Sequence, residues 1–275
     1  MSTLQKRVLS AIVALVVLGA VFYAGGVVFK LALTVVAGVG VYELYNAFKL
    51  KGYEPNIQFG ITLVAAPLFY YALKSNGSDL DFAIASFLLM IPLLVLIYFV
   101  YMFSSFVKTG RFENALIELF GGIYVGMPMI MLMLLYNVAY DEMFLIFIIA
   151  FASDTFAYFT GTLIGKNKLC PTISPNKTKE GALGALVGTV IVLISLKFLF
   201  YDKMTYFEAV ALGVIGSALA QIGDLTASIL KRFTGIKDFG KIMPGHGGVL
   251  DRLDSIIFVT PLVLLYVIFK ALHLY

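Results

Sequence analysis

Long apolar runs alternate with short polar loops along nearly the whole chain. A helix needs about 20 apolar residues to cross the hydrocarbon core of a bilayer, and these runs are too long for the short alternating strands of a membrane barrel. The pattern predicts transmembrane helices at 8–24, 27–49, 58–74, 82–106, 113–139, 142–165, 181–201, 205–232 and 252–272. We therefore expect an all-α polytopic membrane protein with about nine transmembrane helices.

Composition supports this class and excludes others. The chain has 275 residues, of which 61% are hydrophobic and 13% charged, whereas soluble domains are nearer half apolar and a quarter charged. The single cysteine, Cys170, excludes an intramolecular disulfide and a cysteine-based metal site. Nucleic-acid binding is not expected, because the sequence shows no basic arm with interleaved aromatic residues. We therefore expect the protein to be embedded in a lipid bilayer.

Basic residues predict the orientation, because they gather in cytoplasmic loops. With the N-terminus inside, nine spans place most of the 20 basic residues on one side and the C-terminus on the opposite side. The hydrophilic loops 166–180 and 231–252 are then both cytoplasmic. We expect N-terminal transmembrane helices over 1–140 and a C-terminal catalytic bundle over 141–275; one continuous membrane domain is the alternative.

A polar stripe follows one face of the predicted helix 205–232. Ser217, Gln221, Asp224 and Ser228 recur at steps of three and four and lead to Lys231 and Arg232. Hydrogen bonds between helices would explain Ser217 and Gln221 equally well. A carboxylate within a membrane helix is costly and needs a cation, so Asp224 is a candidate functional residue.

The stretch KDFGKIMPGHGGVLDRLD, residues 237–254, is polar and glycine-rich. Asp251 and Asp254 are three apart and share one helix face; together with Asp224 they would make an oxygen-rich site of the type that Mg²⁺ uses. Glycines let the backbone approach a ligand closely, although a tight reversal between helices is the alternative. The glycines concerned are Gly245, Gly247 and Gly248. His246 among them could contact phosphate or move a proton.

Cationic residues just before and within this motif form a rim suited to polyphosphate, although the ordinary positive-inside signal explains them equally well. They are Lys231, Arg232, Lys237, Lys241 and Arg252. In the loop 166–180, Thr178 is the expected N-cap of the next helix, with Glu180 in its first turn. The adjacent Lys177 and Lys179 would let that helix start hold phosphate; a solvated, capped helix start is the alternative.

Further carboxylates within predicted spans include Asp154, Glu43 and Glu118. Asp154 shares a helix face with Tyr158 and Gly161. Three roles remain open for it: binding a substrate group, binding the cations of the site, or pairing with a lysine. Glu43 and Glu118 each lie within reach of a cytoplasmic end, where an interfacial or helix-pairing role is expected.

The segment from Ser228 to Asp254 closely resembles the signature of phosphatidate cytidylyltransferases, the CDP-diacylglycerol synthases. Met243 stands where that family more often has Ile, Leu or Phe. ISPNKTKEG, residues 173–181, resembles a second family segment, with Asn176 in place of a lysine. SDTFAYFTG, residues 153–161, resembles a third, in which Asp154 is the matching acid.

This resemblance implies an Mg²⁺-dependent enzyme of the inner (plasma) membrane that converts CTP and phosphatidic acid to CDP-diacylglycerol and pyrophosphate. It implies Asp224 and Asp251 as metal ligands, with a second cation left open. Asp254 would be a third ligand or would orient Arg252. His246, Lys237 and Arg252 would join Asp224 and Asp251 in catalysis. Substrate and phosphate contacts would come from Asp154, Lys177, Thr178, Lys179, Glu180, Ser228, Lys231, Arg232, Asp238, Gly245, Gly247 and Gly248.

Two other functions remain open. The same reaction on another lipid phosphate, as in CDP-archaeol synthases, would need an equally apolar pocket. An ion-coupled transporter could use Asp154 and Asp224 as ion sites, but the chain lacks the internal repeat typical of that class. A homodimer is left open.

Overall fold

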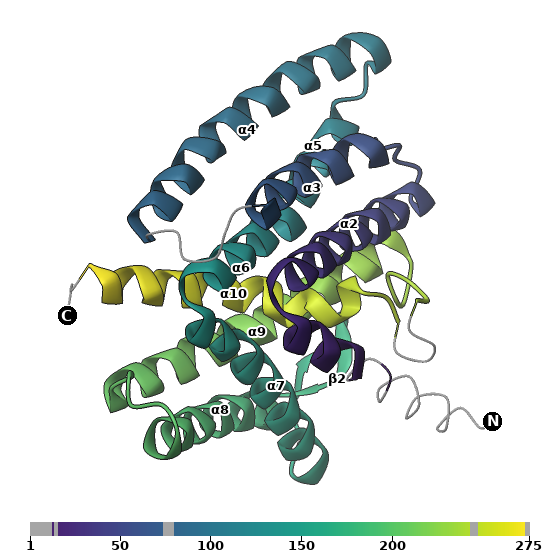
Figure 1. The fold of residues 1–275 in the computed structure, drawn as a ribbon. Helices are drawn as coiled ribbons and strands as arrows, with labels where there is room; N and C mark the ends of the chain where they lie inside the picture. Colours follow the sequence, from purple (N-terminus) through teal and green to yellow (C-terminus); the bar gives the residue numbers. More distant parts are fainter. Residues whose placement is uncertain (1–12, 14–15, 74–79, 243–246, 273–275) are drawn as a thin grey trace. The chain divides into compact units, whose positions relative to one another are not determined.

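The computed structural model describes residues 13, 16–73, 80–242 and 247–272, and Figure 1 shows its ribbon. Residues 16–24 are helical and precede the first labelled helix. The labelled helices are α2 (Gly26–Leu50), α3 (Ile57–Leu73), α4 (Leu80–Thr109), α5 (Phe112–Gly121), α6 (Met127–Val138), α7 (Tyr140–Leu163), α8 (Lys179–Leu199), α9 (Tyr206–Thr234) and α10 (Leu250–Ala271). A π-helical turn, η1 (Gly122–Gly126), joins α5 to α6, and strands β1 (Lys168–Cys170) and β2 (Ser174–Thr178) form a hairpin.

The helices confirm most of the predicted spans. Each span after the first coincides with a helix or helix pair to within three residues at either end. Seven helical segments of the described chain are long and apolar enough to cross a membrane, and Ile57–Tyr71 is a shorter apolar helix. The first predicted span lies largely outside the described residues. The chain is thus a multi-pass membrane protein by its apolar helices, and its orientation stays a prediction.

Two local features depart from the prediction of uninterrupted helices. The span predicted over 113–139 contains the π-helical turn, a form that occurs mostly as single turns inside helices. Pro128 follows within the first two positions of α6, where its missing N–H costs little. The loop 166–180 contains the β1–β2 hairpin, a small exception to the all-α prediction.

The chain forms two compact units, each described by itself below. Unit 1 comprises residues 1–139 and 234–251, and unit 2 comprises residues 140–233 and 252–275. The functional division into 1–140 and 141–275 stays a prediction.

Unit 1 is organised around Tyr45 of α2. The ring is fully buried and lies between Gly60 of α3 and Gly121 of α5, where a Cβ at either glycine would overlap it. Its hydroxyl donates a hydrogen bond of 2.7 Å to the carbonyl oxygen of Glu118. The buried Glu118 carboxylate accepts the N–H of Asn56 at 2.6 Å. These contacts hold α2, α3 and α5 together, so the predicted helix-pairing role of Glu118 agrees with its position.

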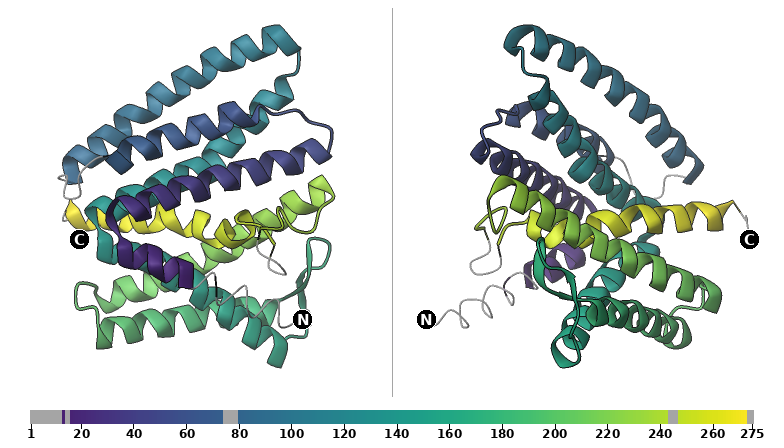
Figure 2. Two further views of the ribbon diagram at one scale, coloured as in Figure 1. Left: turned by 45° about the vertical axis from the view of Figure 1, so that its right-hand side comes forward. Right: turned by 180° about the vertical axis from the view of Figure 1, so that it is seen from behind.

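In unit 2, helices α7 and α8 lie side by side in every ribbon view (Figure 2). They run antiparallel, because Gly181 near the start of α8 lies against Gly161 near the end of α7, whereas Gly188 further along α8 lies against the earlier Phe156. A Cβ at Gly184 would overlap Thr160, and one at Gly188 would overlap the ring of Phe156. Small residues at such interfaces let helix backbones approach closely in a membrane.

This packing predicts that Gly188→Ala destabilises the protein by about 1–3 kcal/mol, the usual cost of overpacking. The change should lower the midpoint of thermal unfolding in detergent. Gly19→Ala is the matched control, because Gly19 is helical and a Cβ there meets nothing within 4 Å. Equal midpoints for Gly188→Ala and wild type would contradict the close α7–α8 packing.

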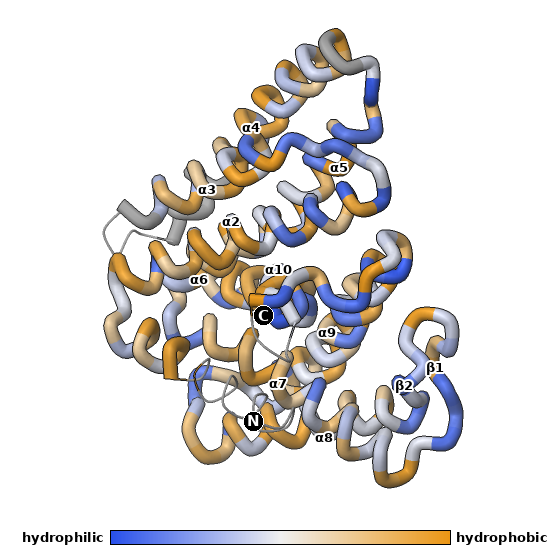
Figure 3. The backbone as a smooth tube through the Cα atoms, turned by 90° about the vertical axis from the view of Figure 1, so that its right-hand side faces the viewer, coloured by the Kyte–Doolittle hydropathy of each residue, from blue (hydrophilic) through white to orange (hydrophobic). Residues whose placement is uncertain are grey.

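Helix α9 packs against three helices of unit 2. Ser153 Oγ of α7 lies 2.9 Å from Ser217 Oγ of α9. Gln221 of α9 donates from Nε2 to the carbonyl oxygen of Ala182 in α8 at 3.3 Å. Ser255 of α10 donates from Oγ to the carbonyl oxygen of Ala220 at 3.2 Å. The four helices therefore share one packed assembly, and Figure 3 shows hydrophilic positions gathered near the hairpin and the end of α9.

Candidate active site

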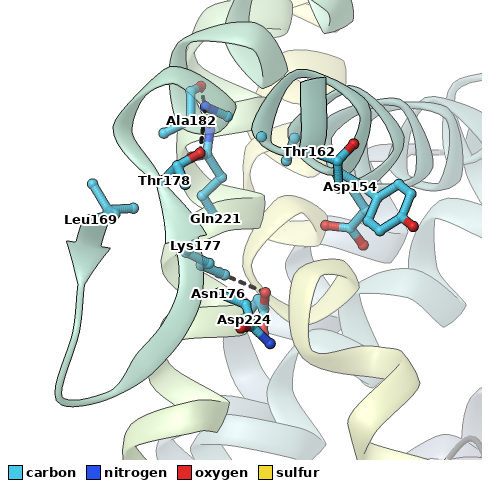
Figure 4. Close-up of a pocket in the computed structure, with 13 residues that line it drawn as sticks. Asp154, Thr162, Leu169, Asn176, Lys177, Thr178, Ala182, Gln221 and Asp224 are labelled. Atoms are coloured by element: carbon cyan, nitrogen blue, oxygen red, sulfur yellow. Dashed lines mark hydrogen bonds and ion pairs between the residues drawn. The ribbon is translucent and has the colours of Figure 1, made fainter. Parts of the chain in front are cut away.

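A cavity of about 500 Å³ lies in unit 2 where α7, the hairpin, α8 and α9 meet (Figure 4). Two acids and one base face it among uncharged polar, small and apolar residues. Its lining residues are Asp154, Ala157, Tyr158, Gly161, Thr162, Leu169, Asn176, Lys177, Thr178, Gly181, Ala182, Gln221 and Asp224. Several of these are predicted site residues from segments far apart in the sequence, so the fold brings them together.

The shortest polar contact in the cavity joins the hairpin to α9. Lys177 Nζ lies 2.6 Å from Asp224 Oδ2, and their side chains are 23% and 34% exposed. Figure 4 shows this ion pair at the cavity wall. The sequence predicted a cation for Asp224, and in the described structure Lys177 supplies it. Both groups remain accessible from the cavity.

Two further carboxylates, Asp154 and Asp254, interact electrostatically with Asp224 of this pair. Asp154 of α7 interacts with Asp224, Lys177 and Arg252. Asp254 of α10 interacts with Asp224, Asp154 and Lys231. A Cβ at Gly223 would overlap the carbonyl oxygen of Asp254, so this glycine lets the start of α10 approach α9 next to Asp224. The result is a mixed cluster of three acids and several bases.

The hairpin holds Lys177 in place. β1 and β2 are antiparallel, and Lys168 pairs with Thr178. Thr178 is the N-cap of α8, as predicted, because its Oγ1 accepts the N–H of Gly181 at 3.1 Å. Glu180 accepts the backbone N–H groups of Lys166 and Asn167. Thr178 and Glu180 thus stabilise the hairpin and the helix start; their predicted substrate contacts stay a prediction.

The polar stripe of α9 divides into two parts. Ser217 and Gln221 make the interhelical hydrogen bonds described above, so the alternative role expected for them is confirmed. Asp224 faces the cavity one turn further on, and Ser228 is half-buried one turn beyond it. The chemically active part of the stripe is therefore its end towards Lys231.

The cationic residues of unit 2 differ in their surroundings. Arg232 donates from Nε to the carbonyl oxygen of Ile173 at 3.3 Å, which ties α9 to the hairpin. Lys231 is half-buried, and Lys179 and Arg252 are exposed. Besides Lys177, both Lys231 and Arg252 interact with the acidic cluster.

The rest of the glycine-rich motif belongs to unit 1. Asp251 Oδ2 accepts the backbone N–H groups of Phe239 and Gly248, each at 2.9 Å. Gly247 has a φ of +85°, a conformation that favours glycine. Lys237 and Asp238 are exposed. Two predicted site residues, Gly245 and His246, lie outside the described residues.

The residues present fit a divalent cation by their chemistry. Mg²⁺ binds carboxylate and phosphate oxygens and keeps several waters, so it needs few protein ligands. Asp154, Asp224 and Asp254 offer such oxygens within one electrostatically coupled cluster. Outside the gaps in the description, no three His, Cys, Asp or Glu side chains are grouped closely enough to hold an ion by themselves.

Two features of the structure were missed at the sequence level. The ion pair between Lys177 and Asp224 was not predicted, because it depends on the hairpin. Glu43 was expected only at an interface or helix pair, yet it contacts the backbone of the motif. Its position inside an apolar run is the signal that could have directed attention to it.

Comparison with known proteins identifies the family. The pattern of the "Cytidylyltransferase family" matches residues 5–270. This chain belongs to that family. It is 33% identical over 262 residues to the phosphatidate cytidylyltransferase of Staphylococcus saprophyticus, covering 94% of this chain and 97% of the relative. It is also 34% identical over 263 residues to that of Staphylococcus aureus (strain COL), with the same coverage.

A relative from another genus gives the same result. The phosphatidate cytidylyltransferase of Bacillus subtilis (strain 168) is 31% identical over 268 residues, which cover 95% of this chain and 96% of the relative. The cytidylyltransferase likeness therefore extends over both units.

Proposed function

We propose that this chain is a phosphatidate cytidylyltransferase, which converts CTP and phosphatidic acid to CDP-diacylglycerol and pyrophosphate. The observation that carries the proposal is the likeness along nearly the whole chain to enzymes of that name, together with the family match. The charged cavity of unit 2 supports it, because a nucleotide and a lipid headgroup both need cations against their phosphates.

The reaction is a phosphoryl-type transfer. A phosphate oxygen of phosphatidic acid attacks the α-phosphorus of CTP, a new P–O bond forms, and the bond to the β-phosphate oxygen breaks, releasing pyrophosphate. Such transfers depend on positioning and charge neutralisation more than on covalent chemistry. The lipid phosphate is already ionised near neutral pH, so no general base is required.

The residues of unit 2 have distinct parts in this proposal. Lys177, Lys231 and Arg252 bind phosphate oxygens and offset their charge. Asp224 and Asp254 would hold Mg²⁺, and Asp154 interacts electrostatically with both. The ion, when bound, neutralises charge that develops on the transferring phosphate and on pyrophosphate. Asp251 of unit 1, predicted with Asp224 as a metal ligand, accepts hydrogen bonds from the motif backbone.

We place the enzyme in the cell membrane with its hairpin and the 231–252 segment facing the cytoplasm. The basic residues of both segments favour that side, and CTP is a cytoplasmic metabolite. Phosphatidic acid enters from the bilayer, so its phosphate meets CTP near the membrane surface.

The proposal is tested with purified protein in detergent, Mg²⁺, CTP and a panel of lipid phosphates. Phosphatidic acid should give CDP-diacylglycerol, a chelator should abolish the product, and added Mg²⁺ should restore it. Product only from an ether-linked lipid phosphate would assign the chain to the CDP-archaeol type instead. Absence of product from every lipid phosphate would refute a cytidylyltransferase role.

A further inference from the structure

Glu43 of α2 is a buried carboxylate in contact with the glycine-rich motif of the same unit. Only 3% of it is exposed. Its Oε1 accepts the backbone N–H of Val249 at 3.1 Å, and its Oε2 accepts that of Leu250 at 2.8 Å. The two partners lie more than 200 residues away in the sequence. A burial this deep is costly for a carboxylate unless its oxygens are hydrogen-bonded.

These two N–H groups are at the start of α10, which begins at Leu250. The first N–H groups of a helix have no partner within the helix, and a negative charge there interacts favourably with the helix dipole. Most helices are capped by a Ser, Thr, Asp or Asn that precedes them. Val249 precedes α10 and has no polar side chain, so Glu43 takes the place of the missing cap.

Two glycines of the motif make room for this carboxylate. A Cβ at Gly240 or at Gly248 would overlap Glu43 Oε1. Gly240 precedes the gap in the description and Gly248 follows it, so Glu43 meets the motif on both sides. The sequence suggested that dense glycines leave space for a ligand; at these two positions the space is filled by Glu43.

The same helix start carries Asp251 in its first turn. Asp251 Oδ2 accepts hydrogen bonds from Phe239 and Gly248, and a Cβ at Gly247 would lie 2.8 Å from that oxygen. Glu43 and Asp251 therefore bind neighbouring backbone groups of one segment. Moving either carboxylate would displace the other through the N–H groups of residues 248–250.

We propose that Glu43 is a positioning residue of the cytidylyltransferase reaction: by capping α10 and seating Gly240 and Gly248, it fixes where α10 begins and hence where Asp251 lies. This inference rests on the proposed function and on the catalytic role that the sequence predicts for Asp251. Glu43 itself contacts neither substrate nor metal in this account.

The test is a double-mutant cycle with Glu43→Ala, Gly240→Ala and the combined variant, together with the near-isosteric Glu43→Gln. We measure kcat, KM for CTP, the Mg²⁺ concentration for half-maximal activity and the unfolding midpoint. Glu43→Gln replaces one acceptor oxygen with a donor facing an N–H group. It should lower kcat at least about 10-fold and raise the Mg²⁺ requirement while the protein stays folded.

In the cycle, Gly240→Ala alone should lower kcat because the new methyl group displaces the Glu43 carboxylate. In the combined variant that carboxylate is absent, so activity should be no lower than in Glu43→Ala alone. The positioning role would be overturned if the fold-loss in kcat of the combined variant equalled the product of the two single-variant losses. It would also be overturned if Glu43→Gln kept the wild-type kcat and Mg²⁺ requirement. An inactive wild type would instead count against the proposed function, so the two failures are distinguishable.

Discussion

Replacing Asp224 with asparagine is expected to lower kcat about 100- to 1000-fold, the usual loss when one preorganised charge is removed from a polar active site. Asp224 forms an ion pair with Lys177, whose Nζ lies 2.6 Å from Asp224 Oδ2. It also interacts electrostatically with Asp154 and Asp254. The amide keeps the size of the side chain but removes the charge that would hold Mg²⁺. Initial rates of product formation at saturating CTP and lipid give the measurement.

Asp202→Asn is the matched control for that experiment. Asp202 is fully exposed and pairs with Lys197 at 2.6 Å. The hydrogen bond from Lys197 lowers the pKa of the Asp202 carboxyl, so the control also exchanges an ionised, paired carboxylate for an amide in unit 2. It should retain wild-type kcat. An Asp224→Asn enzyme as active as this control would remove Asp224 from the site.

Replacing Lys177 with methionine is expected to lower kcat/KM for CTP about 100-fold. Lys177 lines the cavity and contacts Asp224, so methionine removes a phosphate-binding charge and leaves the carboxylate without that cation. Charge-assisted hydrogen bonds to phosphate are about twice as strong as neutral ones. A loss in kcat/KM at an unchanged unfolding midpoint would assign the effect to the reaction rather than to folding.

Lys168→Met in the same hairpin controls for this change. Lys168 is exposed in β1 and pairs with Thr178 in the strand register, but it does not line the cavity. Its removal should leave kcat/KM within about twofold, since exposed surface charges contribute little. Equal kinetics for the two variants would show that Lys177 acts only through the general charge of the hairpin.

The helices were largely predictable, because the thickness of the bilayer core imposes about 20 apolar residues on each span. The run over 142–165 became α7 and that over 205–232 became α9, each shifted by at most two residues. The hairpin was not predictable in the same way. Its strands have three and five residues, too few for a periodic pattern to emerge.

The candidate site was predictable by residue type but not by pairing. Intramembrane charge directed attention to Asp154 and Asp224, and both line one cavity. That Lys177 is the partner of Asp224 depends on how the hairpin folds over α9. The Glu43 contacts could not be predicted either, because they join α2 to the start of α10 across most of the chain. Periodicity within one helix carries no information about such distant pairs.

The most direct test of the central claim follows each phosphorus atom of CTP. Purified protein is incubated with Mg²⁺, phosphatidic acid and CTP labelled either at the α- or at the γ-phosphate. The account predicts that α-label enters the lipid fraction as CDP-diacylglycerol and that γ-label is released as pyrophosphate. In Asp224→Asn both signals should appear about 100- to 1000-fold more slowly. Label from the γ-position in the lipid, or neither label transferred by the wild type, would contradict it.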